Sequence, residues 1–184
     1  MHNIRLLPYV LIDGIPTFKD SEIIQIYNWM KNDRTLETVF YNISKDKMSE
    51  SFFLRFWKRK DLKMFVIFSE NKVAGLIWLD RIIDSTAMIH INAFKWTWGG
   101  NNIALFKWAT CEIFIKHNID VLIGQMPVIN KVAINFSKNV GFIKCGIIPK
   151  SLYVYRLNKK VDAYLGYATK DRFLQSMDKQ DNTF

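Results

Sequence analysis

The sequence predicts an α/β fold built on one mixed, mostly antiparallel central sheet with helices on both faces. Short apolar runs separated by tight turns follow one another between residues 64 and 94, as in an antiparallel meander. Apolar residues at helical spacing flank this meander on both sides. No repeat or Pro/Gly/Ser-rich linker divides the 184 residues. We therefore expect one domain over residues 1–177, followed by a polar, frayed tail at 178–184.

The first half of the chain is expected to supply a strand, two helices and the meander. Leu6–Ile12 is an apolar run of strand type, and Asp13–Pro16 ends it. The elements expected next are a helix from Asp20 or Ser21 to Met30, a helix over Ser44–Trp57, and strands over Met64–Phe68, Val73–Leu79 and Ala87–Phe94.

The second half begins with a glycine-containing loop and a long apolar helix. The elements expected in order are a loop over Lys95–Asn102, a helix over Ile103–Lys116, a strand over Val121–Gly124, a helix over Asn130–Val140, and late strands over Phe142–Ile148, Leu152–Leu157 and Ala163–Ala168. Gly141 is the stop signal of the second of these helices, because glycine is favoured just after a helix end.

Composition limits the classes of function. The chain has 26 Lys and Arg against 17 Asp and Glu, a net charge of +9, which favours an anionic partner such as nucleic acid or a phosphorylated cofactor. The alternative explanation, which the sequence favours equally, is that the basic surface only keeps the protein soluble. Two cysteines and three histidines lack metal-ligand spacing, so we expect no metal and a reducing, cytoplasmic compartment. No apolar run reaches the roughly 20 residues that cross a bilayer, so no membrane partner is expected.

A loop of the sequence Trp98-Gly99-Gly100-Asn101-Asn102 joins a strand to the long helix. The first N–H groups of a helix have no internal partners, and the helix dipole is positive there. Glycines allow a ligand to approach this backbone closely. The loop is therefore a candidate cradle for a phosphate or pyrophosphate, and the alternative is a plain strand-to-helix turn.

A second motif follows the next strand. Asn130, Ala133, Phe136, Gly141 and Phe142 match in register the pattern N-x-x-A-x-x-Y/F-x-x-x-x-G-F. In this respect the chain resembles the GNAT superfamily of acyl-CoA-dependent N-acetyltransferases, whose order of elements also fits. The resemblance implies a GNAT-like fold and transfer of an acetyl group from acetyl-CoA to an amine.

The resemblance further implies that the strand Met88–Phe94 diverges from the strand Val121–Gly124 and leaves a cleft for acetyl-CoA. The residues implied in cofactor binding are Ala93, Phe94, Trp98, Gly99, Gly100, Asn101, Asn102, Asn130 and Phe136. Three features depart from the family pattern. Trp96 or Thr97 stands at the Gln/Arg position of the loop, and Asn101 or Asn102 replaces one loop glycine. Phe136 stands where relatives commonly carry the tyrosine that protonates the departing thiolate.

The strand before the loop carries the candidate catalytic residues. Alternation places His90 and Asn92 on one face of this strand. Histidine gains and loses a proton near neutral pH, so His90 is a candidate general base, and Asn92 is a candidate for orienting substrate or water. The alternative for His90 is a hydrogen-bonded, half-buried histidine. Asp80 and Asp84 flank the preceding turn and are expected to be solvated.

Three readings of function remain open from the sequence. The first is an acetyltransferase whose acceptor is an amine on a small molecule or a macromolecule. The second is a protein on a GNAT-like fold that modifies or accompanies nucleic acid. A looser likeness to phage-type members, through Ile89-His90-Ile91 and the segment from Gly141 to Asp162, favours it. The third is a CoA-binding relative without turnover.

Overall fold

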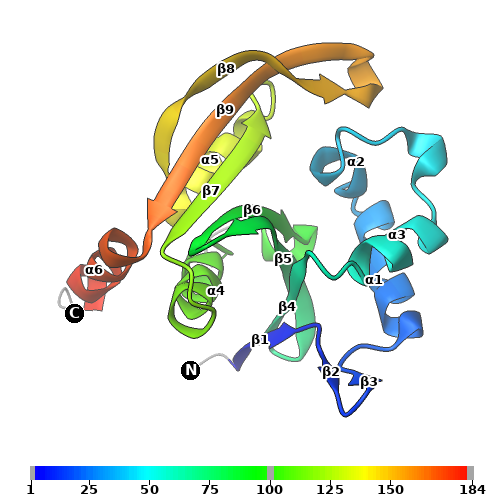
Figure 1. Ribbon diagram of the computed structural model, residues 1–184, viewed down its shortest axis with the longest axis horizontal. Helices are drawn as coiled ribbons and strands as arrows, with labels where there is room; N and C mark the ends of the chain where they lie inside the picture. Colours follow the sequence, from blue (N-terminus) through cyan, green and yellow to red (C-terminus); the bar gives the residue numbers. More distant parts are fainter. Residues whose placement is uncertain (1–2, 99–101, 182–184) are drawn as a thin grey trace.

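The computed structural model describes residues 3–98 and 102–181. Within them, seven strands form one sheet in the order β1-β4-β5-β6-β7-β9-β8 (Figure 1). The strands are β1 (Ile4–Pro8), β4 (Lys63–Ser69), β5 (Lys72–Ile83), β6 (Thr86–Ala93), β7 (Val121–Pro127), β8 (Ile143–Val154) and β9 (Lys159–Thr169). Only β6 and β7 pair in parallel. The predicted fold class is confirmed.

Helices cover both faces of this sheet. They are α1 (Asp20–Asn32), α2 (Leu36–Val39), α3 (Glu50–Trp57), α4 (Asn102–Lys116), α5 (Lys131–Val140) and α6 (Lys170–Asp181), with 3-10 turns η1 (Lys45–Lys47), η2 (Lys95–Thr97) and η3 (Tyr155–Leu157). Figure 1 shows α1–α3 on one side of β4–β6 and α4 on the other.

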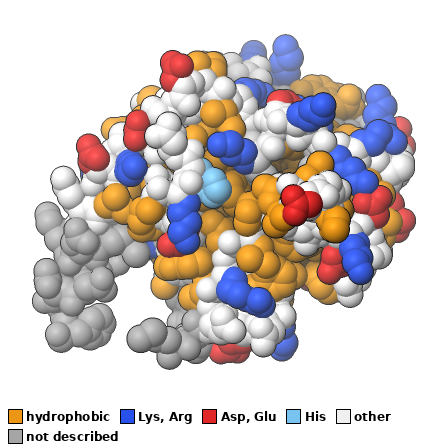
Figure 2. All heavy atoms as spheres, turned by 60° about the horizontal axis from the view of Figure 1, so that its bottom comes forward, with side chains coloured by type: hydrophobic (Ala, Val, Ile, Leu, Met, Phe, Trp, Pro, Cys, Tyr) orange, Lys and Arg blue, Asp and Glu red, His pale blue; other side chains and the backbone are white. Residues whose placement is uncertain are grey.

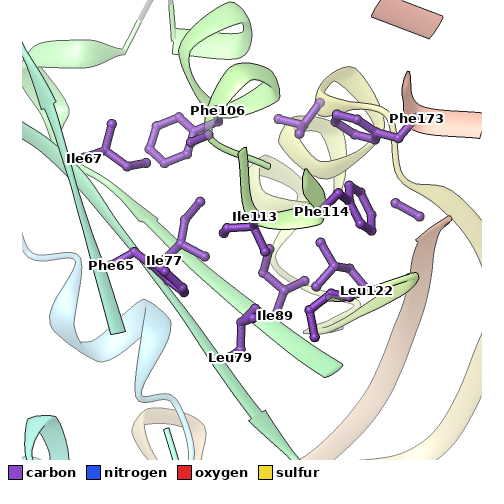
Figure 3. Close-up of a cluster of buried hydrophobic side chains, with 14 of the residues drawn as sticks. Phe65, Ile67, Ile77, Leu79, Ile89, Phe106, Ile113, Phe114, Leu122 and Phe173 are labelled. Atoms are coloured by element: carbon purple, nitrogen blue, oxygen red, sulfur yellow. The ribbon is translucent and has the colours of Figure 1, made fainter. Parts of the chain in front are cut away.

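Two hydrophobic clusters follow from the alternation of side chains along the central strands. On β5, Ile77 and Leu79 face α4, where they join Phe106 in the first cluster (Figure 3). Leu76 and Trp78 face the other way and pack with the buried residues of α1 and α3. Because both faces are covered, the central strands are apolar at nearly every position, and the alternation of burial is weak.

The helix predicted over Ser44–Trp57 is wrong in its first turn and a half. Ser49 caps α3 at Glu50, because its hydroxyl accepts a hydrogen bond of 3.2 Å from the Phe52 N–H. The preceding residues form only the short turn η1. The sequence analysis also missed α2, which is one turn long, and α6, which crosses the boundary expected at residues 177/178.

Two strand predictions change at prolines and turns. The strand predicted over Leu6–Ile12 ends at Pro8, and a small hairpin of β2 (Leu11–Ile12) and β3 (Ile15–Pro16) follows it. The late strands predicted on either side of Pro149 form the single strand β8, whose pairing with β9 is interrupted between Ile148 and Leu152. A bulge there lets one strand continue past a proline that cannot donate a backbone hydrogen bond.

Gly75 allows α4 to lie close to the sheet, and it provides a stability test. A Cβ atom there would lie 2.5 Å from both the Asn92 carbonyl oxygen and the Phe106 ring. Gly75→Ala is therefore expected to lower the free energy of unfolding by about 1–3 kcal/mol, and Tm by roughly 2–4 °C per kcal/mol. Thermal unfolding measures this difference.

Gly124→Ala is the matched control, because the nearest atom to its added Cβ would be Met126 Cε at 3.8 Å, an ordinary contact. Equal melting temperatures for the two variants would contradict the close approach of α4 to β5.

Candidate active site

The parallel pair β6–β7 separates after three residue pairs, the last of which is Met88 with Ile123. Beyond this point β6 still pairs with β5 as far as Ala93, and β7 with β9 as far as Pro127. Each strand therefore keeps one edge of backbone N–H and C=O groups outside the sheet ladder. The predicted divergence of Met88–Phe94 from Val121–Gly124 is confirmed.

A cleft of about 720 Å³ opens where the two strands part. Its walls come from β6, β7, the N-terminal ends of α4 and α5, and the segment from Asp33 to Tyr41. The candidate catalytic and cofactor-binding residues from the sequence analysis that line it are His90, Asn92, Ala93, Trp98, Asn102, Asn130 and Phe136. Residues distant in the sequence thus meet at one cavity.

Both helix N-termini at the cleft present backbone N–H groups. Asn102 and Ile103 begin α4 and line the cavity. Asn130 caps α5, and its Oδ1 accepts a hydrogen bond of 3.2 Å from the Ala133 N–H. Gly99, Gly100 and Asn101 lie outside the described residues. The positive ends of two helix dipoles therefore favour an anionic ligand at this end of the cleft.

His90 lies on β6 against two residues of β5. Its ring stacks on Trp78 at 5.1 Å between centroids, and its Nε2 lies 3.3 Å from Asp80 Oδ1. Neither of these two atoms has a hydrogen-bond partner within the part of the chain that the structure describes. The contact becomes an ion pair when His90 takes up a proton, so the carboxylate stabilises the protonated ring.

Asp80 differs from the solvated carboxylate that the sequence analysis expected. Its side chain is only 18% exposed. Burial alone raises the pKa of this carboxyl, but His90 and the Arg81 and Arg59 guanidiniums outweigh burial, so the pKa of Asp80 lies below its ordinary value. Asp80 is consequently a carboxylate at neutral pH and keeps its charge beside His90. Asp84 is exposed, as expected.

Asn92 lies two residues beyond His90 and is 2% exposed. Its Nδ2 amide group has no hydrogen-bond partner among the described residues, although the residue lines the cleft. A buried donor without a partner is costly, so such a group is satisfied by a water, an ion or a ligand where one can reach it. Asn92 is therefore suited to donate a hydrogen bond to a substrate oxygen or a water.

The remaining predicted residues divide between the cleft and the core. Trp98 lines the cleft, and its Nε1 donates to the Ala93 carbonyl at 3.1 Å. Phe94 does not line this cleft: it follows the last residue of β6 on the same side as His90 and Asn92, but it is buried in the second core cluster, where Trp29 packs edge-on against it. Phe136 lines the cleft and packs against Phe106 at 5.3 Å between ring centroids.

The sequence analysis did not name Tyr41, which comes to the cleft from the segment between α2 and η1. Burial, above all, raises the pKa of its phenol. Its carbonyl accepts a hydrogen bond of 2.9 Å from the Tyr155 N–H, which joins this segment to the β8–β9 hairpin. No local sequence pattern marks Tyr41 as a site residue. For Asp80 there was a signal: pairing Trp78 with His90 in the predicted meander places Asp80 diagonally across from His90.

Within residues 3–98 and 102–181, no three His, Cys, Asp or Glu side chains gather as metal ligands would. The helices in these ranges include none with the length and apolar character needed to cross a bilayer.

No family model matches the sequence, and no curated protein matches it. Solved structures do match in fold. Spermidine N-acetyltransferase from Vibrio cholerae, solved with CoA and spermine, has a TM-score of 0.69 and 17% identity, over 93% of this chain and 98% of that one. An acetyltransferase from Salmonella typhimurium that modifies the N-terminal serine of a ribosomal protein has a TM-score of 0.70 and 14% identity, over 90% and 94%.

A ribosomal-protein-alanine acetyltransferase from Vibrio fischeri has a TM-score of 0.67 and 16% identity, over 92% of this chain and 93% of that one. All three matches extend over nearly the whole of both chains. The chain therefore has the GNAT fold of these N-acetyltransferases.

Proposed function

We propose that this protein transfers an acetyl group from acetyl-CoA to an amine. The observation that carries the proposal is the parting of β6 and β7, which leaves two unpaired backbone edges facing a cleft beside the N-terminus of α4. An extended ligand with amide groups pairs with such an edge as a strand does. The fold neighbours, which are N-acetyltransferases, support the same activity.

The residues present fit acetyl-CoA as the acetyl donor. The edge of β6 from Ile89 to Ala93 offers N–H and C=O groups to the amides of its pantetheine arm. The N-terminus of α4, with the loop at Gly99–Asn102, would hold its pyrophosphate through backbone N–H groups and the helix dipole. Asn130 and Phe136 line the same cleft and would contact the arm.

The thioester supplies a carbonyl carbon that is open to attack by a nucleophile. His90 takes a proton from the ammonium group of the acceptor, directly or through one water, and the Asp80 carboxylate stabilises the charge that the ring gains. The amine nitrogen then bonds to the carbonyl carbon and the carbon–sulfur bond breaks. CoA leaves as a thiolate and gains a proton, while the nitrogen loses its second proton to form the amide.

Two other side chains serve the same reaction in this proposal. Asn92 Nδ2 donates to a substrate oxygen or to the water. Phe136 cannot protonate the leaving thiolate, and the phenol of Tyr41 is a group in the cleft that can, since it carries its proton at neutral pH.

The net charge favours nucleic acid as a second candidate partner. Retention on DNA that falls as salt rises would support it, because phosphate contacts release counterions.

The loop before α4 provides a test of donor binding. Gly100→Asp is expected to weaken binding of CoA far more than Gly100→Ala, because aspartate adds a negative charge where the ligand is anionic. Calorimetric titration of both variants with CoA measures the difference. If both bind as tightly as the unchanged protein, the loop is a plain turn.

The pair of Asp80 and His90 provides a test of chemistry. His90→Ala should lower turnover by about 10²–10⁴-fold while CoA binding is kept. Asp80→Asn should lower kcat/KM by up to about 10²-fold through lost orientation, and Asp84→Asn is the control, because Asp84 is exposed on the following turn. The pH profile of kcat/KM, or of slow acetyl-CoA hydrolysis until an acceptor is known, should lose its rise with increasing pH in His90→Ala.

An unchanged rate and pH profile in His90→Ala would remove His90 from the mechanism. Tight CoA binding without transfer to any amine tested would identify the protein as a non-catalytic CoA-binding relative instead.

A further inference from the structure

The segment from β7 to β9, residues 121–169, carries a one-sided charge. It has seven Lys and Arg but one acidic residue, Asp162, whereas the rest of the chain has nineteen against sixteen. The seven are Lys131, Lys138, Lys144, Lys150, Arg156, Lys159 and Lys160, and every one is exposed. Figure 2, which views the molecule with the lower end of Figure 1 forward, shows acidic and basic side chains interspersed. We name the seven cations the basic flank.

The basic flank has no compensating partners in the described structure. None of its seven side chains forms an ion pair with a described acidic group. The one acidic side chain of this segment, Asp162, is hydrogen-bonded to the backbone instead: its Oδ1 accepts a hydrogen bond of 2.9 Å from the Lys150 N–H. Exposed cations without ion-pair partners raise the local concentration of anionic molecules.

The basic flank borders the cleft at two places. Lys131 lies in the first turn of α5 between Asn130 and Val132, which both line the cleft. At the other end, η3 of the β8–β9 hairpin contacts the cleft residue Tyr41 through the Tyr155 N–H. Figure 1 shows the hairpin curving from α6 toward α2. A molecule held on this flank therefore has a route into the cleft.

Exposed aliphatic side chains stand among these cations. Ile129 is 43% exposed, Val132 69%, Ile147 47% and Ile148 44%. The Val128 N–H donates to the Asp162 carbonyl, and the Lys150 N–H donates to the Asp162 side chain. Ile129, which follows Val128, therefore lies near Lys150. Nucleic acids pair cations with aromatic stacking platforms, whereas polypeptides bury aliphatic groups within a charged rim. Tyr155 is exposed as well, at 43%, but aliphatic side chains outnumber aromatic ones here, and this favours a polypeptide partner over a nucleic acid.

We propose that the acceptor amine belongs to an acidic polypeptide, whose carboxylates and apolar side chains dock on the basic flank while its terminal amine enters the cleft. This inference rests on the proposed function and names its substrate class. It separates this protein from the spermidine N-acetyltransferase that shares its fold, since spermidine is a polycation that the flank would repel.

Two synthetic peptides test the proposal. Both begin with the same three alanines and a free terminal amine, and continue with leucine alternating with either glutamate or arginine. The glutamate peptide should be acetylated with a kcat/KM at least roughly tenfold higher at low salt, and the gap should narrow at high salt. Fluorescence anisotropy of the two peptides, labelled and already acetylated, measures docking without turnover.

Charge reversal locates the effect. Lys150→Glu with Lys160→Glu should remove the preference for the glutamate peptide in both measurements. Lys63→Glu with Lys72→Glu is the matched control, because it makes the same change in net charge at exposed sites outside the cleft. The control should keep the preference, and melting temperatures of both double variants check their folding.

Equal docking of the two peptides, or equal loss of preference in the control, would overturn the proposal. Tighter binding of an RNA or DNA oligomer than of the glutamate peptide would overturn it in favour of a nucleic-acid partner. Docking of the glutamate peptide without acetyl-CoA binding would instead contradict the proposed function and leave the basic flank as a polypeptide site.

Discussion

The early parting of β6 and β7 is the constraint on which the site depends. Three residue pairs join these strands, and then β5 holds β6 while β9 holds β7. Backbone groups at the parting edges require partners, and water or an extended ligand must supply them. Close packing of Phe106 of α4 against Gly75 of β5 keeps the N-terminus of α4 at the same opening. The parting of β6 and β7 thus opens the cleft, and the positive end of the α4 dipole lies beside it.

The chemistry of the site follows from the pairing of β5 with β6. Because Trp78 lies opposite His90, the ring gains a stacking partner, and Asp80 reaches it diagonally at 3.3 Å. On the same face, Asn92 is buried with an unpartnered amide, and Phe94, just beyond the end of β6, is buried in the second core cluster. The apolar face of β6 therefore packs under α4 and stabilises the fold, while its other face brings His90 and Asn92 to the cleft.

The sequence predicted the meander, both helices beside the cleft and the C-cap at Gly141, because these depend on local apolar spacing and turn residues. It failed at β2–β3, at the start of α3 and at the bulged strand β8, where Pro8, Ser49 and Pro149 act through backbone hydrogen bonding. Asp80 and Tyr41 were missed as site residues, because their places depend on strand register and on the contact of a distant hairpin with the segment after α2.

Amide hydrogen exchange with and without CoA tests most directly the claim that the parted strands form the donor site. The account predicts that CoA slows exchange at Ile89–Ala93, at Gly124–Met126 and in the first turn of α4, and leaves β1, β4 and α3 unchanged. Tight binding with no protection on β6 and β7, or with protection confined to residues outside the cleft, would contradict it.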